Sequence, residues 1–227
     1  MKCIVFGLGN FGAALCTKLT ELGNEVIGVD KRLDKVEQLK DKITHTVCLD
    51  STDVQAVNTL PVKEADLVVI GIGEDEGASL LTTALMKQLK ARRIVSRAVS
   101  PLQEIILEAM GVTEIIHPEA EMAEKFAKKL QFVGVYDSFQ LTKNYNLVEI
   151  QVPSDFVGKT VGEIPFAETY KVAVLATVQQ RETDNLLGKR KKILEINQIA
   201  TPDTRLEEGD LMVLFGHVKD IQKLLEN

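Results

Sequence analysis

The stretch "IVFGLGNFGAALC", residues 4–16, joins an apolar run to a helical pattern through Gly7, Gly9 and Gly12. Their G-x-G-x-x-G spacing is typical of a strand-to-helix turn that holds a phosphate group. The first glycine permits the tight turn, the second lets a pyrophosphate approach the backbone, and the third lets helix and strand pack closely. Free N–H groups at the helix start would attract the phosphates. The alternative is that the glycines are purely structural and the turn is empty.

An acidic residue lies where this motif expects one. The next apolar run, "EVIGVD", ends at Asp30, 18 residues after Gly12. A carboxylate at the end of the second strand accepts hydrogen bonds from ribose hydroxyls and repels a 2′-phosphate. The sequence therefore predicts a bound nucleotide and disfavours NADP. Lys31 and Arg32 weaken the second point, because a basic pair could neutralise an extra phosphate.

Short β-branched runs alternate with helical patterns up to about residue 117. Strands are expected within residues 2–8, 25–30, 45–50, 65–72, 92–98 and 113–118, and helices at 11–22, near Val36 and Leu39, through Leu81 and Leu89, and near 102–110. This alternation predicts an α/β fold, a doubly wound parallel Rossmann-like sheet. Pro118 then begins a helix whose Met122, Phe126 and Leu130 form an apolar stripe. That stripe packs on its own domain or crosses to another subunit.

Strands dominate after residue 134. They are expected within residues 135–142, 145–153, 171–180, 191–199 and 210–216, followed by a short helix at 218–227. We therefore expect two domains. The Rossmann-like domain with the helix after Pro118 takes residues 1–133, and a second, smaller α+β domain takes residues 134–227.

Other polar and glycine residues follow the expected strands. Ligands of open α/β sheets lie beyond the carboxyl ends of the strands, near the point where strand order reverses. Asp50 ends the third strand and could bind an adenine amino group, or it could cap the next helix, a role that Ser51, Thr52 or Asp53 could also take. The residues predicted to bind the nucleotide are Gly7, Leu8, Gly9, Asn10, Phe11, Gly12, Asp30, Lys31, Arg32, Asp50, Ser51, Thr52, Gly71, Ile72, Gly73 and Arg97.

Composition narrows the class of protein. The chain has 227 residues, a net charge of −6 and no Trp, which argues against a nucleic-acid partner. No apolar run approaches the ~20 residues that span a bilayer, and the first residues lack a signal-peptide pattern. Three cysteines without paired spacing predict neither a disulfide framework nor a zinc site. We expect a cytoplasmic protein.

Catalytic groups are not visible in the sequence. No Ser-His-Asp or Cys-His pairing stands at interpretable positions. A dehydrogenase needs an acid/base and an anion clamp from a substrate domain, and the small, strand-rich second half offers no obvious His or Lys for these roles. This favours a nucleotide sensor over an enzyme. A small NAD-dependent oxidoreductase is the alternative.

Motifs along the whole chain resemble a known family. They are "GLGNFG" at 7–12, the acid Asp30, "LDSTD" at 49–53, "RA" at 97–98, "HPE" at 117–119, "VPSDFVGKTVGEI" at 152–164 and "LEEGDLMVLFG" at 206–216. In this order they resemble RCK domains, the cytoplasmic nucleotide-binding regulators of bacterial Trk/Ktr potassium-uptake systems. The glycine motif alone is unspecific, whereas the pair of domains in this order and length is much more specific.

The resemblance implies a function and an assembly. A regulatory subunit of this kind binds ATP, ADP or NAD(H) and gates a membrane potassium channel subunit by conformational change. Dimers, joined through the helix after Pro118, assemble into an octameric ring at the inner face of the cell membrane. Glu119 matches a position that ligates a divalent cation in some relatives. Others bind a cyclic dinucleotide at stretches that match residues 171–173 and the region around Pro202.

This chain departs from the family pattern inside the glycine motif. Many relatives have Arg at the position of Asn10, and that Arg can reach toward a γ-phosphate. Asn supplies neither the charge nor the forked donors of a guanidinium. The departure puts discrimination between ATP and ADP by this residue in doubt.

Overall fold

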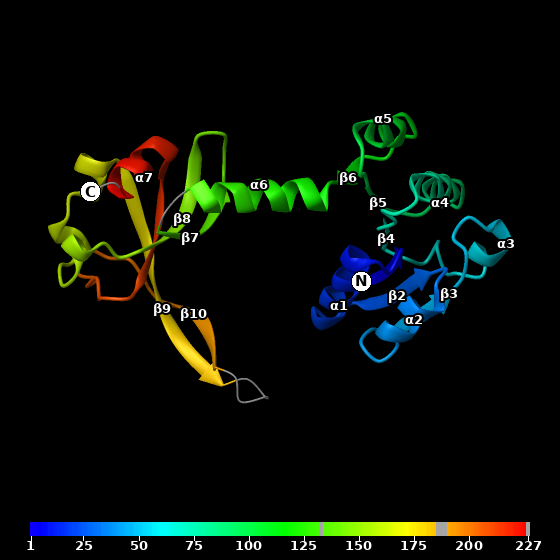
Figure 1. The fold of residues 1–227 in the computed structure, drawn as a ribbon, viewed down its shortest axis with the longest axis horizontal. Coiled ribbons are helices and arrows are strands. Elements are labelled where there is room, and N and C mark those ends of the chain that lie inside the picture. Colours follow the sequence, from blue (N-terminus) through cyan, green and yellow to red (C-terminus); the bar gives the residue numbers. More distant parts are fainter. Residues whose placement is uncertain (132–133, 185–189, 226–227) are drawn as a thin grey trace. The chain divides into compact units, whose positions relative to one another are not determined.

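The computed structural model describes residues 1–131, 134–184 and 190–225, and the chain divides into two compact units, Met1–Glu121 and Met122–Asn227 (Figure 1). Helix α6 (Pro118–Gln131) crosses this division. The boundary predicted from the sequence, after residue 133, falls at the end of α6, beside residues outside the described part.

The first unit is built on a parallel sheet with the strand order β3-β2-β1-β4-β5-β6. Its elements are β1 (Lys2–Phe6), α1 (Asn10–Glu21), β2 (Glu25–Asp30), α2 (Leu33–Leu39), β3 (His45–Cys48), α3 (Val54–Val57), β4 (Leu67–Ile70), α4 (Glu76–Gln88), β5 (Ile94–Arg97), α5 (Pro101–Ala109) and β6 (Glu114–Ile116). This confirms the predicted doubly wound α/β fold. The strand order reverses between β1 and β4, so the turn after β1 lies at the switch point.

The central strand β1 feeds two hydrophobic cores, because successive side chains of a strand point to opposite faces. Cys3 and Val5 pack in a cluster with side chains of α1 and α2, while Ile4 and Phe6 pack with side chains of α3 and α4. Helices therefore cover both faces of the sheet (Figure 1). Burial on both faces explains why β1 is an uninterrupted apolar run from Cys3 to Phe6.

The turn from β1 to α1 depends on two glycines. Gly7 has φ +89°, and a Cβ there would lie 2.9 Å from the backbone nitrogen of Ile72 at the end of β4. A Cβ on Gly12 would lie 1.8 Å from the carbonyl oxygen of Gly7. Strand and helix therefore approach each other at a distance that no other residue type permits at position 12.

The described residues of the second unit form an antiparallel sheet with the order β10-β9-β11-β8-β7. Its elements are β7 (Val135–Gln140), β8 (Tyr145–Gln151), β9 (Val172–Asp184), β10 (Arg190–Ile199), β11 (Leu211–His217) and α7 (Val218–Leu225). α7 packs on this sheet through Ile221 and Leu224. The strands and helix of this unit confirm the predicted α+β class. The sequence did not predict the short helical turns at Ser154–Phe156, Val161–Glu163 and Phe166–Tyr170.

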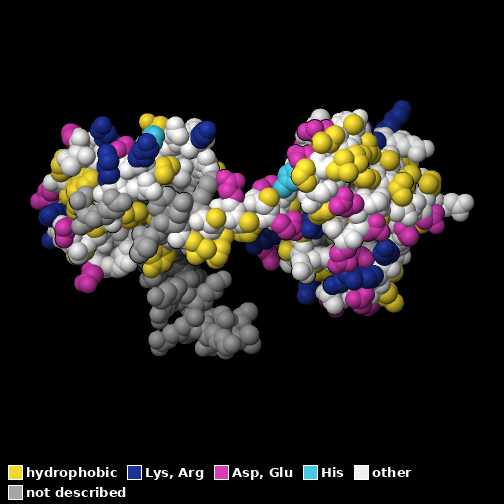
Figure 2. Space-filling model, turned by 45° about the horizontal axis from the view of Figure 1, so that its top comes forward, with side chains coloured by type: hydrophobic (Ala, Val, Ile, Leu, Met, Phe, Trp, Pro, Cys, Tyr) yellow, Lys and Arg dark blue, Asp and Glu magenta, His cyan; other side chains and the backbone are white. Residues whose placement is uncertain are grey.

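The apolar stripe on α6 is exposed. Met122, Phe126 and Leu130 are 63%, 59% and 71% accessible, and Figure 2 shows hydrophobic side chains on the surface of this helix. Of the two alternatives drawn from the sequence, packing on the chain's own domain is not what the described residues show. Within the described residues, no helix has the length and apolar character needed to cross a membrane.

Substituting Gly12→Ala tests the contact between β1 and α1. We expect the free energy of unfolding to fall by about 2 kcal/mol or more, because the added Cβ must displace a backbone carbonyl. Urea denaturation measures the change. Gly9→Ala is the matched control, because a Cβ at Gly9 meets no described atom within 4 Å. Equal stability of the two variants would show that this contact is not a constraint.

Asp210 gives the second unit a pH-dependent stability. Burial, with a smaller contribution from Glu207, raises the pKa of this carboxyl, and its Oδ2 has no hydrogen-bond partner in the described part of the chain. Its raised pKa means that the folded state holds the proton more tightly, so stability falls as the pH rises through that pKa. We expect Asp210→Asn to raise the Tm at pH 7 and to lose this advantage near pH 4. Scanning calorimetry at both pH values measures the Tm. An equal gain in Tm at pH 7 and near pH 4 would contradict the assignment.

Candidate functional site

A cavity of about 440 Å³ lies at the carboxyl ends of the parallel strands of the first unit. Its described lining residues are Gly7, Gly9, Asn10, Phe11, Val29, Asp30, Lys31, Arg32, Leu49, Asp50, Ser51, Gly71, Ile72, Gly73, Glu74, Asp75, Ala78, Arg97 and Glu119. The volume falls within the range usual for small-molecule sites. The structure thus brings together thirteen of the sixteen residues that the sequence predicted.

Three predicted residues do not line the cavity. Leu8 is buried in the core beside α1 and α2, and it contributes a backbone N–H rather than a side chain. Gly12 lies behind the turn against Gly7. Thr52 donates two hydrogen bonds to Asp50, and its neighbour Ser51 is the residue that lines the cavity.

The start of α1 opens into this cavity without a cap. Gly9 is the N-cap residue, and no described side chain accepts from the first N–H groups of the helix. In contrast, Asp53 caps α3, Asp75 caps α4 and Ser100 caps α5. The unpaired N–H groups and the positive end of the helix dipole therefore offer a site for an anion.

Asp30 connects the glycine turn to the end of β2. Its Oδ2 accepts from the backbone N–H of Leu8 at 2.7 Å, and its Oδ1 accepts from the backbone N–H of Arg32 at 2.9 Å. Each carboxylate oxygen has a second acceptor site, so the side chain keeps the capacity to accept from a ligand hydroxyl. The carboxylate is therefore both part of the turn and a feature of the cavity wall.

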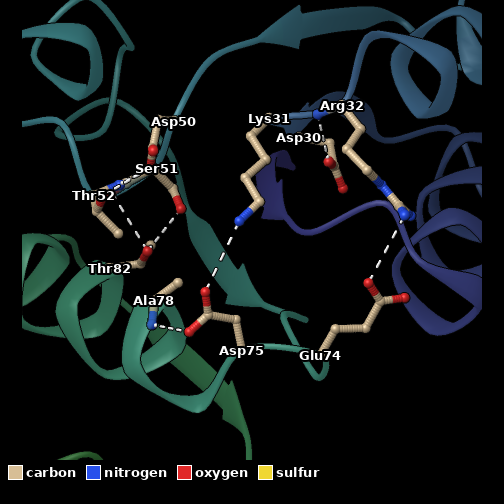
Figure 3. Close-up of polar contacts among 10 residues, drawn as sticks. All are labelled: Asp30, Lys31, Arg32, Asp50, Ser51, Thr52, Glu74, Asp75, Ala78 and Thr82. Atoms are coloured by element: carbon tan, nitrogen blue, oxygen red, sulfur yellow. Dashed lines mark hydrogen bonds and ion pairs between the residues drawn. The ribbon is translucent and has the colours of Figure 1, made fainter.

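Two ion pairs span the cavity between the end of β2 and the loop before α4 (Figure 3). Lys31 Nζ lies 3.9 Å from Asp75 Oδ2, and Arg32 Nη1 lies 3.8 Å from Glu74 Oε2. The side chains are largely exposed, so each pair contributes little to stability. The sequence missed the two acids as site residues, although they follow the predicted fourth strand directly.

Asp50 forms a local turn rather than a helix cap. Its Oδ1 accepts from the backbone N–H of Thr52 at 2.9 Å and from its hydroxyl at 2.7 Å, and these bonds hold the pKa of Asp50 below its usual range. The cap of α3 is Asp53, so capping by Asp50 is excluded, and recognition of an adenine amino group by Asp50 stays a prediction. Ser51 is fixed from the other side, because its Oγ accepts from Thr82 on α4 at 2.8 Å (Figure 3).

Arg97 lies on the wall formed by β4 and β5. Its guanidinium carbon is 5.9 Å from the ring centroid of Phe11, and a Cβ on Gly73 would come within 2.5 Å of that carbon. Its Nη2 donates to Glu119 Oε1 at 2.5 Å. The described residues contain no cluster of three or more His, Cys, Asp or Glu side chains that could hold a metal ion. A cation at Glu119 stays a prediction.

Comparisons with known proteins agree with this architecture. The TrkA-N domain family matches residues 3–118, and the TrkA-C domain family matches residues 147–227. The chain is 32% identical over 219 residues to the Ktr system potassium uptake protein C of Bacillus subtilis, covering 96% of this chain and 93% of that protein.

Two solved structures share the fold. The GsuK channel bound to NAD matches all of this chain with a TM-score of 0.62 at 16% identity, and this chain spans 39% of that one. The NAD(P)-binding domain of an exopolyphosphatase-related protein from Archaeoglobus fulgidus matches 57% of this chain, and 96% of its own, with a TM-score of 0.51 at 26% identity. With both domain families matched in order and a potassium-uptake relative aligned over nearly its full length, the chain belongs to the TrkA-N/TrkA-C family, the RCK-domain regulatory subunits of Trk/Ktr potassium-uptake systems.

Proposed function

We propose that the first unit binds an adenine nucleotide, NAD(H), ATP or ADP, and that binding gates the potassium-transporting membrane partner by conformational change. The observation that carries this proposal is the uncapped start of α1, which opens into a 440 Å³ cavity beside Asp30. A pyrophosphate at Gly9 would accept from the free N–H groups of the helix. The ribose hydroxyls would then donate to Asp30.

The charges around the cavity favour an unphosphorylated 2′ position. Asp30 repels a 2′-phosphate, and the two bases beside it already face acids, Lys31 facing Asp75 and Arg32 facing Glu74. An extra phosphate would have to compete with both carboxylates for these cations. This supports NAD(H) over NADP(H). The bound NAD of the GsuK structure and the NAD(P)-binding character of the Archaeoglobus domain agree with a dinucleotide in this fold.

Position 10 changes how a terminal phosphate would be recognised. Asn10 lines the cavity but has no charge, whereas Arg97 on the neighbouring wall supplies a guanidinium. We expect Arg97 to take over part of the phosphate recognition that family members assign to the glycine loop. Discrimination between ATP and ADP then depends on how far the terminal phosphate extends toward this residue.

Regulation, rather than turnover, fits the groups that are present. No histidine is among the described residues that line the cavity, so the side chain that most often serves as a general acid/base is not supplied there. The relative with 32% identity is a potassium uptake protein. A regulator needs only different affinities of the nucleotide for two conformations, typically ~1–3 kcal/mol of coupling per site.

The exposed stripe on α6 supports self-association. Met122, Phe126 and Leu130 recur on one face of an amphipathic helix and are largely accessible to solvent. Burial of such side chains against a second copy would favour a dimer through the hydrophobic effect. A dimer joined in this way, at the cytoplasmic face of the membrane partner, is the smallest unit through which nucleotide binding could act.

Nucleotide binding is tested with Gly9→Ala. Because its Cβ would occupy the approach of a pyrophosphate, we expect the affinity for NADH and ADP to fall about tenfold, or ~1.4 kcal/mol, with unfolding unchanged. Isothermal calorimetry measures the affinity. Potassium uptake in cells that also produce the membrane partner should lose its response to nucleotide. Wild-type protein that binds none of NADH, ADP or ATP would contradict the proposal.

Asp30→Ala separates the ribose from the phosphate. We expect weaker binding of NADH and ADP and a relative gain for NADPH, because the repulsion of the 2′-phosphate is removed. The variant also loses two backbone hydrogen bonds, so circular dichroism and a melting curve establish that it is folded. An unchanged ratio of NADH to NADPH affinity would show that ribose is not held at Asp30.

A further inference from the structure

Among the described residues, contacts other than the ion pair with Glu119 also hold Arg97 in place. Its side chain is 15% accessible, its guanidinium lies over the ring of Phe11, and Gly73 leaves the space that it fills. Nη1 reaches the carbonyl oxygen of Gly71 at 3.4 Å, a weak contact. Nε is buried and has no partner among the described residues. The arginine is thus fixed on the cavity wall with donor capacity to spare.

Glu119 is placed differently. Its side chain is 63% accessible, and it lies in the first turn of α6. Its Oε1 accepts from Arg97 Nη2 at 2.5 Å. The same glutamate lines the cavity, so it lies where it can meet a bound ligand. Of the two partners, Glu119 is the one that is free to move away.

Arg97 is a cation of the cavity that contacts a residue of α1 directly. The described lining residues carry five acids and three bases: Asp30, Asp50, Glu74, Asp75 and Glu119 against Lys31, Arg32 and Arg97. Lys31 and Arg32 are exposed at the mouth, whereas Arg97 lies over Phe11, the second residue of α1. A phosphate at the start of α1 would therefore lie in the cavity that both Arg97 and Glu119 line.

We infer that the Arg97–Glu119 ion pair is a nucleotide-responsive switch: a phosphate of the bound nucleotide takes Arg97, and Glu119 is released. The inference rests on the proposed nucleotide site. Release acts on α6, the helix that crosses the division between the two units. Without nucleotide, the pair ties the first turn of α6 to β5. With nucleotide, that tie is replaced by a bond to the ligand.

The switch predicts opposite effects for its two residues. In Glu119→Gln the competing charge is gone, so affinity for ADP should rise about threefold to tenfold. In Arg97→Gln affinity for ADP should fall by a similar factor. Adenosine, which has no phosphate, should bind all variants within about twofold of wild type. Calorimetric titration in the presence of EDTA, which removes divalent cations, measures each affinity.

Two further variants make the result specific. Glu121→Gln is the control, because it removes a charge from the same turn of α6. Glu121 accepts from the backbone N–H of His117 and is not among the described lining residues of the cavity, so ADP affinity should stay unchanged. In the double variant Arg97→Gln with Glu119→Gln, the second substitution should no longer raise ADP affinity. Hydrogen exchange of the Glu121 amide, which donates to the carbonyl oxygen of His117 at the start of α6, should increase when ADP binds to wild type and should not change when it binds to Arg97→Gln.

The outcomes distinguish a failure of the switch from a failure of the nucleotide site. If wild-type protein binds ADP but Glu119→Gln binds it equally well or more weakly, the switch is overturned and the nucleotide site stands. If Glu119→Gln raises the affinity for adenosine as much as for ADP, the competition is not with phosphate, and the switch is again overturned. If wild-type protein binds neither ADP nor NADH, the nucleotide site and the switch fail together.

Discussion

The site depends on the close packing of Gly12 against the carbonyl oxygen of Gly7, which leaves no space for a Cβ at position 12. It sets α1 directly against the end of β1, at the point where the strand order reverses. The N–H groups at the start of α1 therefore open into the cavity. Leu8 follows the turn into the core, and its N–H meets the carboxylate at the end of β2. One short approach between backbones thus positions the helix terminus, the cavity and Asp30.

Much of the fold could be predicted because some of its positions accept only one type of residue. Only glycine meets the positive φ of Gly7 and the lack of space at Gly12, and both positions are visible in the sequence. The two-sided burial of β1 appears as an unbroken apolar run, and the change from alternating helices and strands to strands marks the second unit. The helical turns between β8 and β9 were missed, because three short turns leave no regular apolar period.

The site was predictable where a residue acts through its place at a strand end, and less so where it acts through a partner. Asp30 and Arg97 end strands that line the same edge of the sheet, so their convergence follows from the fold. The buried position of the Leu8 side chain was not predicted, because the motif does not show that this side chain points into the core. The pairs Lys31–Asp75 and Arg97–Glu119 join residues far apart in sequence, and no spacing indicates them.

The place of Glu119 has a consequence for any excised nucleotide-binding domain. The TrkA-N match ends at residue 118, one residue before this glutamate. A fragment cut at the family boundary would retain Arg97 with its aromatic and glycine neighbours but would lack the carboxylate that faces it. In such a fragment Arg97 has no Glu119 carboxylate as a partner. Its ligand affinities therefore describe a protein without the intramolecular competitor for Arg97.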